Sequence, residues 1–444
     1  MLTTPESIRT LQRKLYTKAK QEPAYRFYAL YDKVWRADIL MHAYRLVRAN
    51  QGSPGIDGMS FEDIEQKKGI DTFLTELARD LKDRTYAPSP VRRVMIPKAD
   101  GSKRALGIPT IRDRVAQMAV KLVIEPIFEA DFCASSYGFR PKKSAHDAVD
   151  DIAEALHRGY TEVIDADLSK YFDSIPHAKL LAVVAERIVD GAILHLIKLW
   201  LKAPVIGEDE DGTRKNVGGG KANGKGTPQG GVISPLLSNC YLHLLDRIWD
   251  RHQLQKKLQA RIVRYADDFV VLCKGKVDAP LAVLRNVLDR LELSLNESKT
   301  HIVDARQESF NFLGFAIRVS KSWKSGKRYT QVCPAPKSLA KIKGRIKQLT
   351  ARERTPIPLD AIVGSMNTTL RGWVNYFHYR NSSNALEKVK THAEERLRTH
   401  LMKRHKVKDR GIGLGRFPSQ QLYTRYGLYK VPTTAGWRSA HASV

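Results

Sequence analysis

Two apolar, β-branched runs flank a short polar segment at residues 262–273, IVRYADDFVVLC. Residues of these types favour strands, so the pattern predicts a β-hairpin whose turn carries two adjacent carboxylates, Asp267 and Asp268. Adjacent aspartates repel each other, and a site that holds divalent cations through oxygen ligands would give a reason to fix them there. An ordinary solvated turn is the alternative, because aspartate is common in turns.

A second carboxylate pattern occupies residues 163–174, VIDADLSKYFDS. Its alternation places Val163, Asp165 and Asp167 on one face of a short strand, with Asp167 at the C-terminal end. A carboxylate there, facing the aspartate pair of a neighbouring hairpin, would complete three acidic ligands for two Mg²⁺ ions about 3.5–4 Å apart. The chemistry of such a two-metal site is nucleotidyl transfer by in-line displacement.

Other segments predict the elements around these carboxylates. Apolar residues at helical intervals indicate that residues 1–48 are helical. The segments 91–97 and 104–108 flank an Asp-Gly turn and predict a two-stranded finger. The polar, glycine-rich stretch from 206 to 226 is expected to form a mobile loop or a hairpin.

Two amphipathic helices are predicted in the C-terminal third of the chain, each with an apolar stripe and basic residues on its other faces. The stripes are Leu339, Ile342, Ile346 and Leu349 in the first helix, and Leu386, Val389, Ala393, Leu397 and Leu401 in the second. The basic residues expected to bind nucleic acid are Lys341, Lys343, Arg345, Lys347, Arg396, Lys403 and Arg404, and Arg398 is also expected to face outward. A solvated basic face is the alternative for either helix alone.

Charge supports a polyanionic partner. The chain has 75 lysine and arginine residues against 47 aspartate and glutamate residues, a net charge of +28. Eleven basic residues and no acidic residue lie between Arg318 and Arg352. Such a chain is expected to bind nucleic acid, although charge alone does not choose between RNA and DNA. With 444 residues, 42% of them hydrophobic, it can bury a large core in two or three domains.

Several segments, in one order, resemble the core motifs of reverse transcriptases, in the form found in proteins encoded by bacterial group II introns. They are ANQGSPGIDG at 49–58, RVMIPKADGSKRALGIPTIRDRVAQ at 93–117, SSYGFRP at 135–141, ADLSKYFDS at 166–174, TPQGGVISPLLSN at 227–239, RYADDFVV at 264–271, LNESKT at 295–300 and FNFLGF at 310–315. A further segment, LRGWVNYFHY at 370–379, resembles the signature of the maturase domain of these proteins. Several independent motifs in one order are far more specific than any one of them.

The resemblance implies a right-hand α/β polymerase: fingers, a palm with an antiparallel sheet, and an α-helical thumb. The implied domains are an N-terminal extension with fingers at 1–160, a palm at 161–316, a thumb or maturase domain at 317–405 and a short basic tail like a DNA-binding segment at 406–444. Relatives often end in an HNH endonuclease module, for which the residues after Tyr379 leave no room or ligands. Integration would then need an existing 3′ end or a partner nuclease.

The resemblance also assigns roles at the site. The catalytic residues are Asp167, Asp267 and Asp268, and the metal-binding residues are these three with Leu168, for two Mg²⁺ ions with Mn²⁺ as an alternative. The nucleotide-binding residues are Lys98, Arg104, Phe172, Gln229 and Lys299. Phe172 would exclude a 2′-hydroxyl while its neighbour Tyr171 packs in the core, although an aromatic residue here is often core itself. Lys98, Arg104 and Lys299 have the alternative of being solvated surface charges.

The patterns of the remaining aromatic, cysteine and histidine residues argue against further binding sites. Trp373, Tyr376 and Phe377 are expected in the thumb core rather than as platforms for base stacking. The four cysteines are widely separated, which argues against a zinc module or a disulfide framework. His392, His400 and His405 lack acidic or cysteine partners for a metal and are expected on the surface. With no signal peptide or long apolar run, a bacterial cytoplasmic, nucleoid-associated location without membrane contact is predicted.

The predicted function is an RNA-directed DNA polymerase that also promotes splicing and retrohoming of its intron. Its partners would be group II intron RNA, a template RNA with a DNA primer, target DNA and dNTPs. Two alternatives stay open: a splicing-only maturase, and a domesticated reverse transcriptase that serves phage defence, CRISPR adaptation or DNA repair. The complete set of acidic residues argues against the first alternative.

Overall fold

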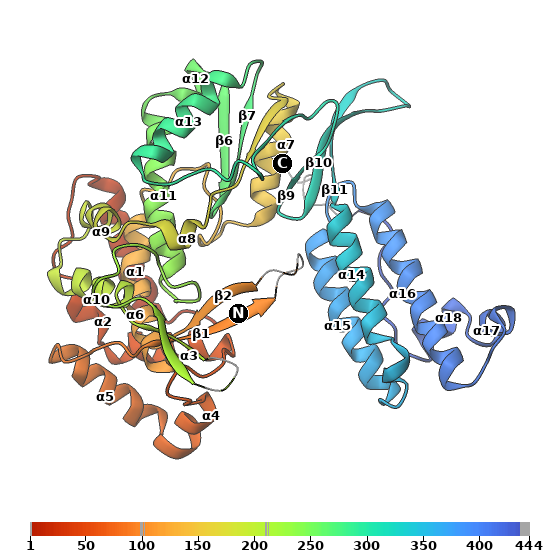
Figure 1. Cartoon of the computed structure of the whole chain (residues 1–444), viewed down its shortest axis with the longest axis horizontal. Coiled ribbons are helices and arrows are strands. Elements are labelled where there is room, and N and C mark those ends of the chain that lie inside the picture. The colour runs from red at the N-terminus through yellow and green to blue at the C-terminus, as the bar shows by residue number, and fades with distance from the viewer. Residues whose placement is uncertain (1, 98–100, 102, 209–210, 212, 436–444) are drawn as a thin grey trace. The chain divides into compact units, whose positions relative to one another are not determined.

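The computed structural model describes residues 2–97, 101, 103–208, 211 and 213–435, and Figure 1 draws them as a cartoon. The helices of this part are α1 Glu6–Gln21, α2 Tyr31–Val34, α3 Ala37–Ala49, α4 Phe61–Asp63, η1 Ile64–Lys68, α5 Ile70–Lys82, α6 Ile111–Glu129, α7 Ala145–His157, α8 Tyr171–Ser174, α9 His177–Ala185, α10 Gly191–Leu201, α11 Ser234–Arg251, α12 Leu254–Lys257, α13 Asp278–Arg290, α14 Pro336–Leu349, η2 Arg352–Arg354, α15 Leu359–Phe377, α16 Ser383–Arg404, α17 Arg410–Arg416 and α18 Ser419–Thr424. The strands are β1 Val91–Pro97, β2 Lys103–Ile108, β3 Glu162–Ala166, β4 Val205–Glu208, β5 Arg214–Gly218, β6 Ala260–Tyr265, β7 Asp268–Cys273, β8 His301–Asp304, β9 Phe310–Phe312, β10 Phe315–Lys321 and β11 Arg328–Pro334. None of the helices described is both long and apolar enough to cross a lipid bilayer.

The strands form three sheets, with the orders β2-β1-β4-β5, β6-β7-β3-β8 and β11-β10-β9. Antiparallel pairing predominates in the first and third sheets: β1 pairs with β2, β4 with β5, and β10 with both β9 and β11. The chain then continues into a helical C-terminal region. This mixed α/β architecture with antiparallel sheets followed by helices confirms the predicted fold class.

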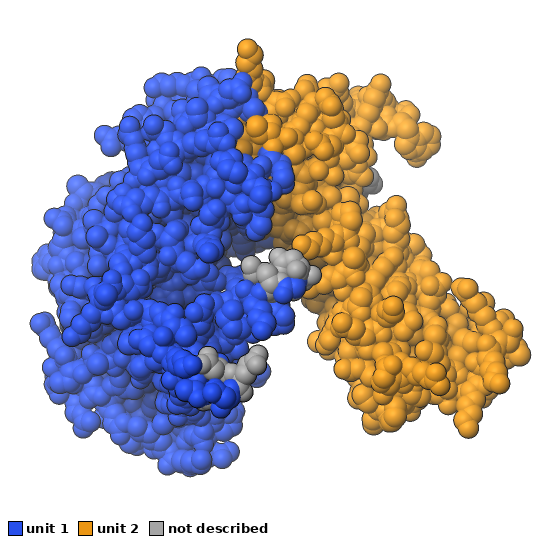
Figure 2. All heavy atoms as spheres, viewed as in Figure 1, with its two compact units in different colours: residues 1–148, 166–271, 277–301 blue, residues 149–165, 272–276, 302–444 orange. Residues whose placement is uncertain are grey.

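The chain divides into two compact units, which Figure 2 shows in different colours. The first unit contains residues 1–148, 166–271 and 277–301, and the second contains residues 149–165, 272–276 and 302–444. The three predicted catalytic aspartates belong to the first unit, and both predicted amphipathic helices belong to the second. The boundaries predicted between the individual domains, at residues 160, 316 and 405, stay predictions.

The predicted finger is present as the antiparallel pair β1 and β2, in register from Arg92 with Ile108 to Pro97 with Lys103. The glycine-rich stretch 206–226 takes the hairpin form, because β4 and β5 pair within it and β4 also adds to β1 in parallel. The insert therefore extends the finger sheet by two strands, and its glycines admit tight turns such as Gly219, with φ of 73°.

Both apolar stripes of the C-terminal helices lie in one hydrophobic core. The core contains Ile342, Ile346 and Leu349 of α14, the whole predicted stripe of α16, and the buried face of α15; Leu339 packs against it. Burying such stripes stabilises helices far more than intrinsic propensity does. The periodic pattern therefore identified the core faces of α14 and α16 correctly.

This core extends beyond residue 405, the predicted end of the domain. Phe417, Leu422, Leu428 and Val431 are buried in the same cluster as the stripes of α14 and α16. Arg398, predicted to face outward, is only 8% exposed, and its Nε donates a hydrogen bond of 3.0 Å to the carbonyl oxygen of Phe417. That prediction is wrong because the chain after α16 folds back over this side of the helix.

Arg396 and Arg404 also differ from their predicted outward placement. Arg396 is half-buried and donates from Nε to the Thr350 hydroxyl at 3.1 Å and from its guanidinium to the Thr350 carbonyl at 3.3 Å. Arg404 donates to the carbonyl oxygens of Thr355 and Ile357 at 2.6 and 2.7 Å. Both guanidinium groups therefore hold the α14–α15 connection, instead of projecting freely into solvent. Lys403 is exposed, as predicted.

The histidines of the α16 segment lie at three different depths. His405 is exposed, whereas His392 is half-buried with Nε2 3.1 Å from the Lys343 carbonyl oxygen. His400 is fully buried, so its predicted surface position is wrong. It lies three residues after Leu397 and one before Leu401, at the edge of the buried stripe, and burial lowers the pKa of its imidazole.

Candidate active site

The predicted hairpin of residues 262–273 is present as β6 and β7, which are neighbours in one sheet. Ala266 and Asp267 lie between the strands, and Ala266 has a left-handed backbone with φ of 58°. Non-glycine residues adopt this conformation only at a cost, which surrounding structure must offset. The turn is therefore an imposed conformation that fixes the direction of Asp267 within it and of Asp268 directly after it.

Asp167 is the first residue after β3, as the alternation predicted. Its carbonyl oxygen accepts a hydrogen bond of 2.8 Å from the Asn296 amide, and the Ser169 amide donates to the Ser294 carbonyl at 2.9 Å. The segment LNESKT thus fixes the backbone that carries Asp167. Leu168, between these contacts, has a buried side chain and could offer a metal only its backbone oxygen.

Asp167 and Asp267 lie close enough to influence each other electrostatically. Burial raises the pKa of Asp267, the negative charge of Asp167 raises it further, and the positive charge of Arg104 opposes this shift. Asp268, the first residue of β7, is exposed. The structure therefore places Asp167 and Asp267 near each other, and Asp268 begins the strand that lies next to β3 in the sheet. Within the described residues, no group of three or more histidine, cysteine, aspartate and glutamate side chains is arranged to hold a metal.

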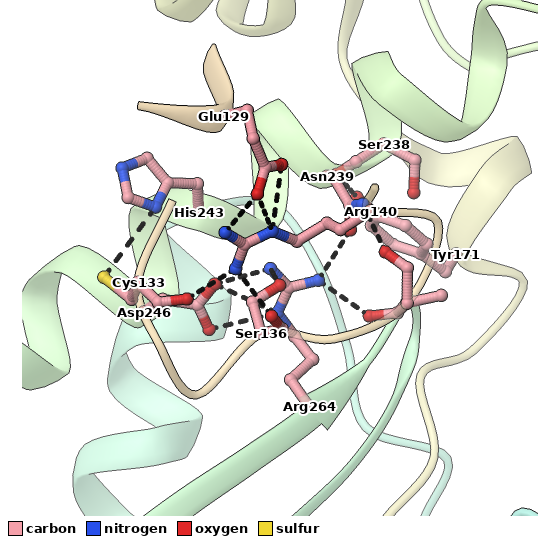
Figure 3. A network of polar contacts seen from close by, with 12 residues as sticks. Glu129, Cys133, Ser136, Arg140, Tyr171, Ser238, Asn239, His243, Asp246 and Arg264 are labelled. Carbon is pink, nitrogen blue, oxygen red and sulfur yellow. Dashed lines mark hydrogen bonds and ion pairs between the residues drawn. The ribbon is translucent and has the colours of Figure 1, made fainter. Parts of the chain in front are cut away.

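A buried arginine, which was not predicted from the sequence, holds the turn between β6 and β7 in place. Arg264 of β6 is fully buried, and Figure 3 shows its guanidinium surrounded by polar groups. It donates to the Asp246 carboxylate from Nε at 3.0 Å, to the Asn239 side-chain oxygen at 2.9 Å and to the Ser136 hydroxyl at 2.6 Å. A further hydrogen bond of 2.9 Å reaches the Ala266 carbonyl oxygen in the turn itself.

The segment SSYGFRP packs directly against the same turn. Arg140 holds this loop by donating to the carbonyl oxygens of Cys133 and Ser136 at 2.7 and 2.6 Å, and it pairs with Glu129. A Cβ atom on Gly138 would lie only 2.3 Å from the Ala266 nitrogen. Only glycine leaves room for this approach, so the loop and the catalytic turn fix each other's position.

Two of the predicted nucleotide-binding residues contact each other. Arg104 donates from Nε to the Gln229 side-chain oxygen at 2.7 Å, and the Gly107 amide donates to the Gln229 carbonyl at 2.6 Å. Gly230 has φ of 115°, and a Cβ atom there would lie 2.2 Å from the Gly107 oxygen. The finger and the TPQGG segment are thus held in close contact by glycines. Lys98 lies outside the described residues.

The adjacent aromatics of ADLSKYFDS have different surroundings. Tyr171 is buried and donates from its hydroxyl to the Ser238 carbonyl at 2.7 Å, which confirms its packing role. Phe172 is 9% exposed, and its carbonyl oxygen accepts from the Thr227 amide at 2.7 Å. Its action on the sugar stays a prediction. Lys299 is largely exposed, with Nζ 3.5 Å from an Asp167 oxygen.

The aromatics of the maturase-like signature belong to a core, as predicted. The Phe315 ring stacks on Tyr376, with centroids 5.4 Å apart, and lies edge to face with Phe377 at 5.1 Å. Trp373 packs against Phe377 at 4.8 Å, and the Tyr376 hydroxyl donates to the Leu313 carbonyl at 2.9 Å. These rings pack against one another within the protein, with Phe377 buried and Trp373 and Tyr376 half-buried.

Comparison with known proteins agrees with this geometry. Residues 96–317 match the reverse transcriptase (RNA-dependent DNA polymerase) family, and residues 339–416 match the group II intron maturase-specific domain. The chain is 35% identical over 368 residues to protein YkfC of Escherichia coli K12, an alignment that covers 74% of this chain and 93% of YkfC.

Two further relatives are encoded in introns. Group II intron-encoded protein LtrA of Lactococcus lactis subsp. cremoris is 32% identical over 366 residues, which cover 67% of this chain and 57% of LtrA. An uncharacterized 91 kDa protein in the cob intron of Schizosaccharomyces pombe is 27% identical over 425 residues, which cover 78% of this chain and 50% of that protein. The chain thus spans little more than half the length of these two relatives.

The two family matches lie in the order that the sequence motifs predicted, polymerase first and maturase second. A reverse transcriptase domain implies dependence on divalent metal ions, and the two domains together imply nucleic-acid substrates. The chain belongs to the group II intron family of reverse transcriptases and maturases, and it is an RNA-directed DNA polymerase with a maturase-specific domain.

Proposed function

We propose that this protein copies group II intron RNA into DNA from a DNA primer, with Asp167, Asp267 and Asp268 as the carboxylates of a two-Mg²⁺ site. The observation that carries the proposal is the position of Asp167 directly after β3, beside β7 in the sheet, which Asp267 precedes and Asp268 begins. Like charges held together are costly without a cation to offset them. Asp167 and Asp267, with the Leu168 carbonyl, would hold such a cation, and Asp268 would reach it from the start of β7.

The chemistry that a bound metal pair supplies is activation of the primer 3′-hydroxyl and stabilisation of the leaving pyrophosphate oxygen. The protein's own groups position the reactants. Arg104 is placed near the carboxylates and would bind the triphosphate through its planar guanidinium. Gln229, held by Arg104 and Gly107, would lie against the templating base pair. Lys299 would offset negative charge beside Asp167.

The helical domain is proposed to bind the intron RNA and so to promote splicing and retrohoming. Its match to the maturase-specific domain supports this role. Lys341, Arg345, Lys347 and Lys403 are exposed and are the proposed phosphate contacts, with Lys343 half-buried among them. Arg396 and Arg404 already donate hydrogen bonds to backbone carbonyl oxygens, so they would contribute less to RNA binding. Splicing itself would be RNA chemistry, to which the protein adds binding free energy for the folded intron.

Primer extension on poly(rA) with oligo(dT), dTTP and Mg²⁺ tests the polymerase proposal. Asp267→Asn removes one negative charge without changing the side chain's size, and we expect extension to fall by at least about 100-fold. Asp278→Asn is the matched control, because Asp278 is exposed at the start of α13. Equal extension by Asp267→Asn and Asp278→Asn would overturn the assignment of the site.

A binding measurement separates the two proposed activities. Asp267→Asn should bind intron RNA as tightly as the native protein, because the helical domain carries the proposed contacts. Simultaneous loss of extension and RNA binding in a variant that stays folded would contradict the division of labour between the two domains.

A further inference from the structure

The turn between β10 and β11 is an ordered structure with an unusual composition. The Ser322 amide donates to the Lys327 carbonyl at 2.9 Å, and the Gly326 amide donates to the Ser322 carbonyl at 2.8 Å. Gly326 takes the left-handed conformation, with φ of 67°, that such a turn needs. Residues 323–325 are thereby held at the tip of a formed hairpin.

Trp323 at this tip is 88% exposed. The other tryptophans that the structure describes, Trp35, Trp200, Trp249 and Trp373, are all buried or half-buried. A tryptophan has a large apolar surface, so a ligand that covers the exposed ring would gain free energy from removing this surface from water. Trp323 was not singled out by the sequence pattern and has no part in the proposed polymerase site.

The surroundings of Trp323 are basic and polar. Lys321, Lys324, Lys327 and Arg328 lie within three strand or turn positions of the tip and are all exposed. The Lys324 ammonium lies 5.3 Å from the centre of the Trp323 ring. No acidic residue occurs between Glu308 and Glu353, so nothing nearby in the sequence neutralises these charges.

Both faces of the hairpin carry basic residues behind the tip. Lys321 and Arg328 are paired on one face, and the pairs that start one position further on lie on the other face. The register pairs Ser320 with Tyr329 and Arg318 with Gln331, so these four residues share a face. Arg318 and Tyr329 are exposed on that face. The hairpin therefore offers a guanidinium on each face and a second exposed ring on the face opposite Lys321 and Arg328, groups of the kinds that bind bases and phosphates.

We propose that the β10–β11 hairpin tip binds unpaired RNA, with the Trp323 ring stacked on a base and Lys321, Lys327 and Arg328 against the flanking phosphates. This inference rests on the proposed function, in which the protein binds intron RNA. Single-stranded RNA fits better than a lipid surface or an apolar protein pocket, because the other tip residues are Ser322, Lys324 and Ser325. Membrane and protein docking sites surround a tryptophan with further apolar residues.

The test compares three variants of the full chain by fluorescence anisotropy, with a labelled single-stranded RNA and a blunt RNA duplex. Stacking on an aromatic contributes about 1–3 kcal/mol per base, so Trp323→Leu should weaken single-strand binding by about 5- to 150-fold. Trp323→Tyr should stay close to native, because it keeps a stacking ring. Tyr28→Leu is the matched control, since Tyr28 is also 69% exposed but lies far away in the sequence.

Salt dependence and substrate separate stacking from charge. The slope of log affinity against log salt should be unchanged in Trp323→Leu, whereas Lys327→Ala should reduce it by about 0.7 for a single strand. Duplex binding should be unaffected by Trp323→Leu, because a paired base cannot stack on the ring. Equal loss of duplex and single-strand binding, or none of either, would overturn the proposal.

A membrane contact at the tip would give a different pattern from RNA stacking. If native protein binds anionic phosphatidylserine vesicles and Trp323→Leu does not, while RNA binding is equal, the tip is a membrane contact and the proposal fails. If the native protein binds no RNA at all, the proposed maturase function itself fails. Native RNA binding together with an unaffected Trp323→Leu variant rejects only the role of the hairpin.

Discussion

Two β-hairpin turns of this protein carry charged and aromatic residues, but they differ in what lies beneath them. The β6–β7 turn rests on the fully buried Arg264, whose guanidinium is satisfied by Asp246, Asn239 and Ser136 and reaches the turn through Ala266. The β10–β11 turn is held by its own backbone hydrogen bonds and leaves Trp323 88% exposed.

The difference follows from what each turn is proposed to do. Holding like charges at a reaction centre needs groups fixed to a fraction of an ångström, which only a supporting shell of buried partners provides. Binding a flexible RNA strand needs an accessible aromatic ring and mobile lysine and arginine side chains. Buried partners under the turn would not improve such binding. Substitutions of the groups that support the first turn should therefore cause large losses of stability, whereas substitutions at the second turn should weaken binding without loss of stability.

The largest effect is expected at Arg264. Arg264→Met leaves Asp246 buried without its partner, and breaking a buried pair in this way costs about 3–5 kcal/mol. Unfolding by guanidinium chloride should show this decrease in the free energy of unfolding. Primer extension should also fall at temperatures where the variant stays folded, because the turn loses its contact at Ala266.

The double variant Arg264→Met with Asp246→Leu controls for the unpaired charge. It should recover much of the stability, because an apolar replacement of a buried ion pair is often tolerated. If it also recovered full primer extension, Arg264 would be only a stabilising residue and would not position the turn.

A pH effect should follow from His243, which lies beside the same network in Figure 3. Burial lowers the pKa of His243 to about 4, so the folded state holds its imidazole neutral where the unfolded chain would protonate it near pH 6.5. The contribution to stability is complete above about pH 6.5 and is lost as the pH falls towards 4, by up to about 3 kcal/mol. In His243→Phe, the free energy of unfolding should depend less on pH in this range. A pH dependence equal to that of the native protein would contradict this role of His243.

A smaller loss is expected from Gly138→Ala, because a Cβ atom there would lie 2.3 Å from the Ala266 nitrogen. Overpacking of this kind costs about 1–3 kcal/mol, and here the displaced group is the catalytic turn, so primer extension should fall more than stability does. Gly191→Ala is the control, since nothing lies within 4 Å of a Cβ atom at that position. Equal extension by the two variants would show that the loop does not position the turn.

The smallest effect on stability is expected at the second turn. Trp323→Leu and Lys324→Ala should each change the unfolding free energy by less than about 0.5 kcal/mol, as is usual for exposed positions. A loss above about 1 kcal/mol would mean that the tip is packed against something in solution, and the contrast between the two turns would disappear. Denaturation without RNA makes this measurement.

The parts of the fold that could be predicted from the sequence are those fixed by local periodicity. Apolar, β-branched runs identified the β6–β7 hairpin, and alternation identified the strand that ends directly before Asp167. Helical spacing identified the stripes of α14 and α16. These patterns repeat within a few residues and need no knowledge of the tertiary structure.

The parts that could not be predicted depend on contacts between distant segments. In the sequence, Arg264 is simply a charged residue within a predicted strand. Its burial depends on contacts with Ser136 and Asp246, which are 128 and 18 residues away along the chain. The one available signal was a charge directly after the apolar residues Ile262 and Val263 of the strand. Arg398 was misplaced because residues after α16 fold back onto the helix, which its own sequence does not indicate. His400 was misplaced because it is buried on the side of α16 that faces Thr350, between α14 and α15.

Manganese binding followed by electron paramagnetic resonance tests the central claim most directly, because it detects the metal site without catalysis. The native protein and Asp278→Asn should bind Mn²⁺ with the same affinity. Asp167→Asn and Asp267→Asn should each lose this binding by at least about 10-fold while remaining folded. Mn²⁺ binding that is equal in all four proteins would contradict the assignment of these two carboxylates to the metal site.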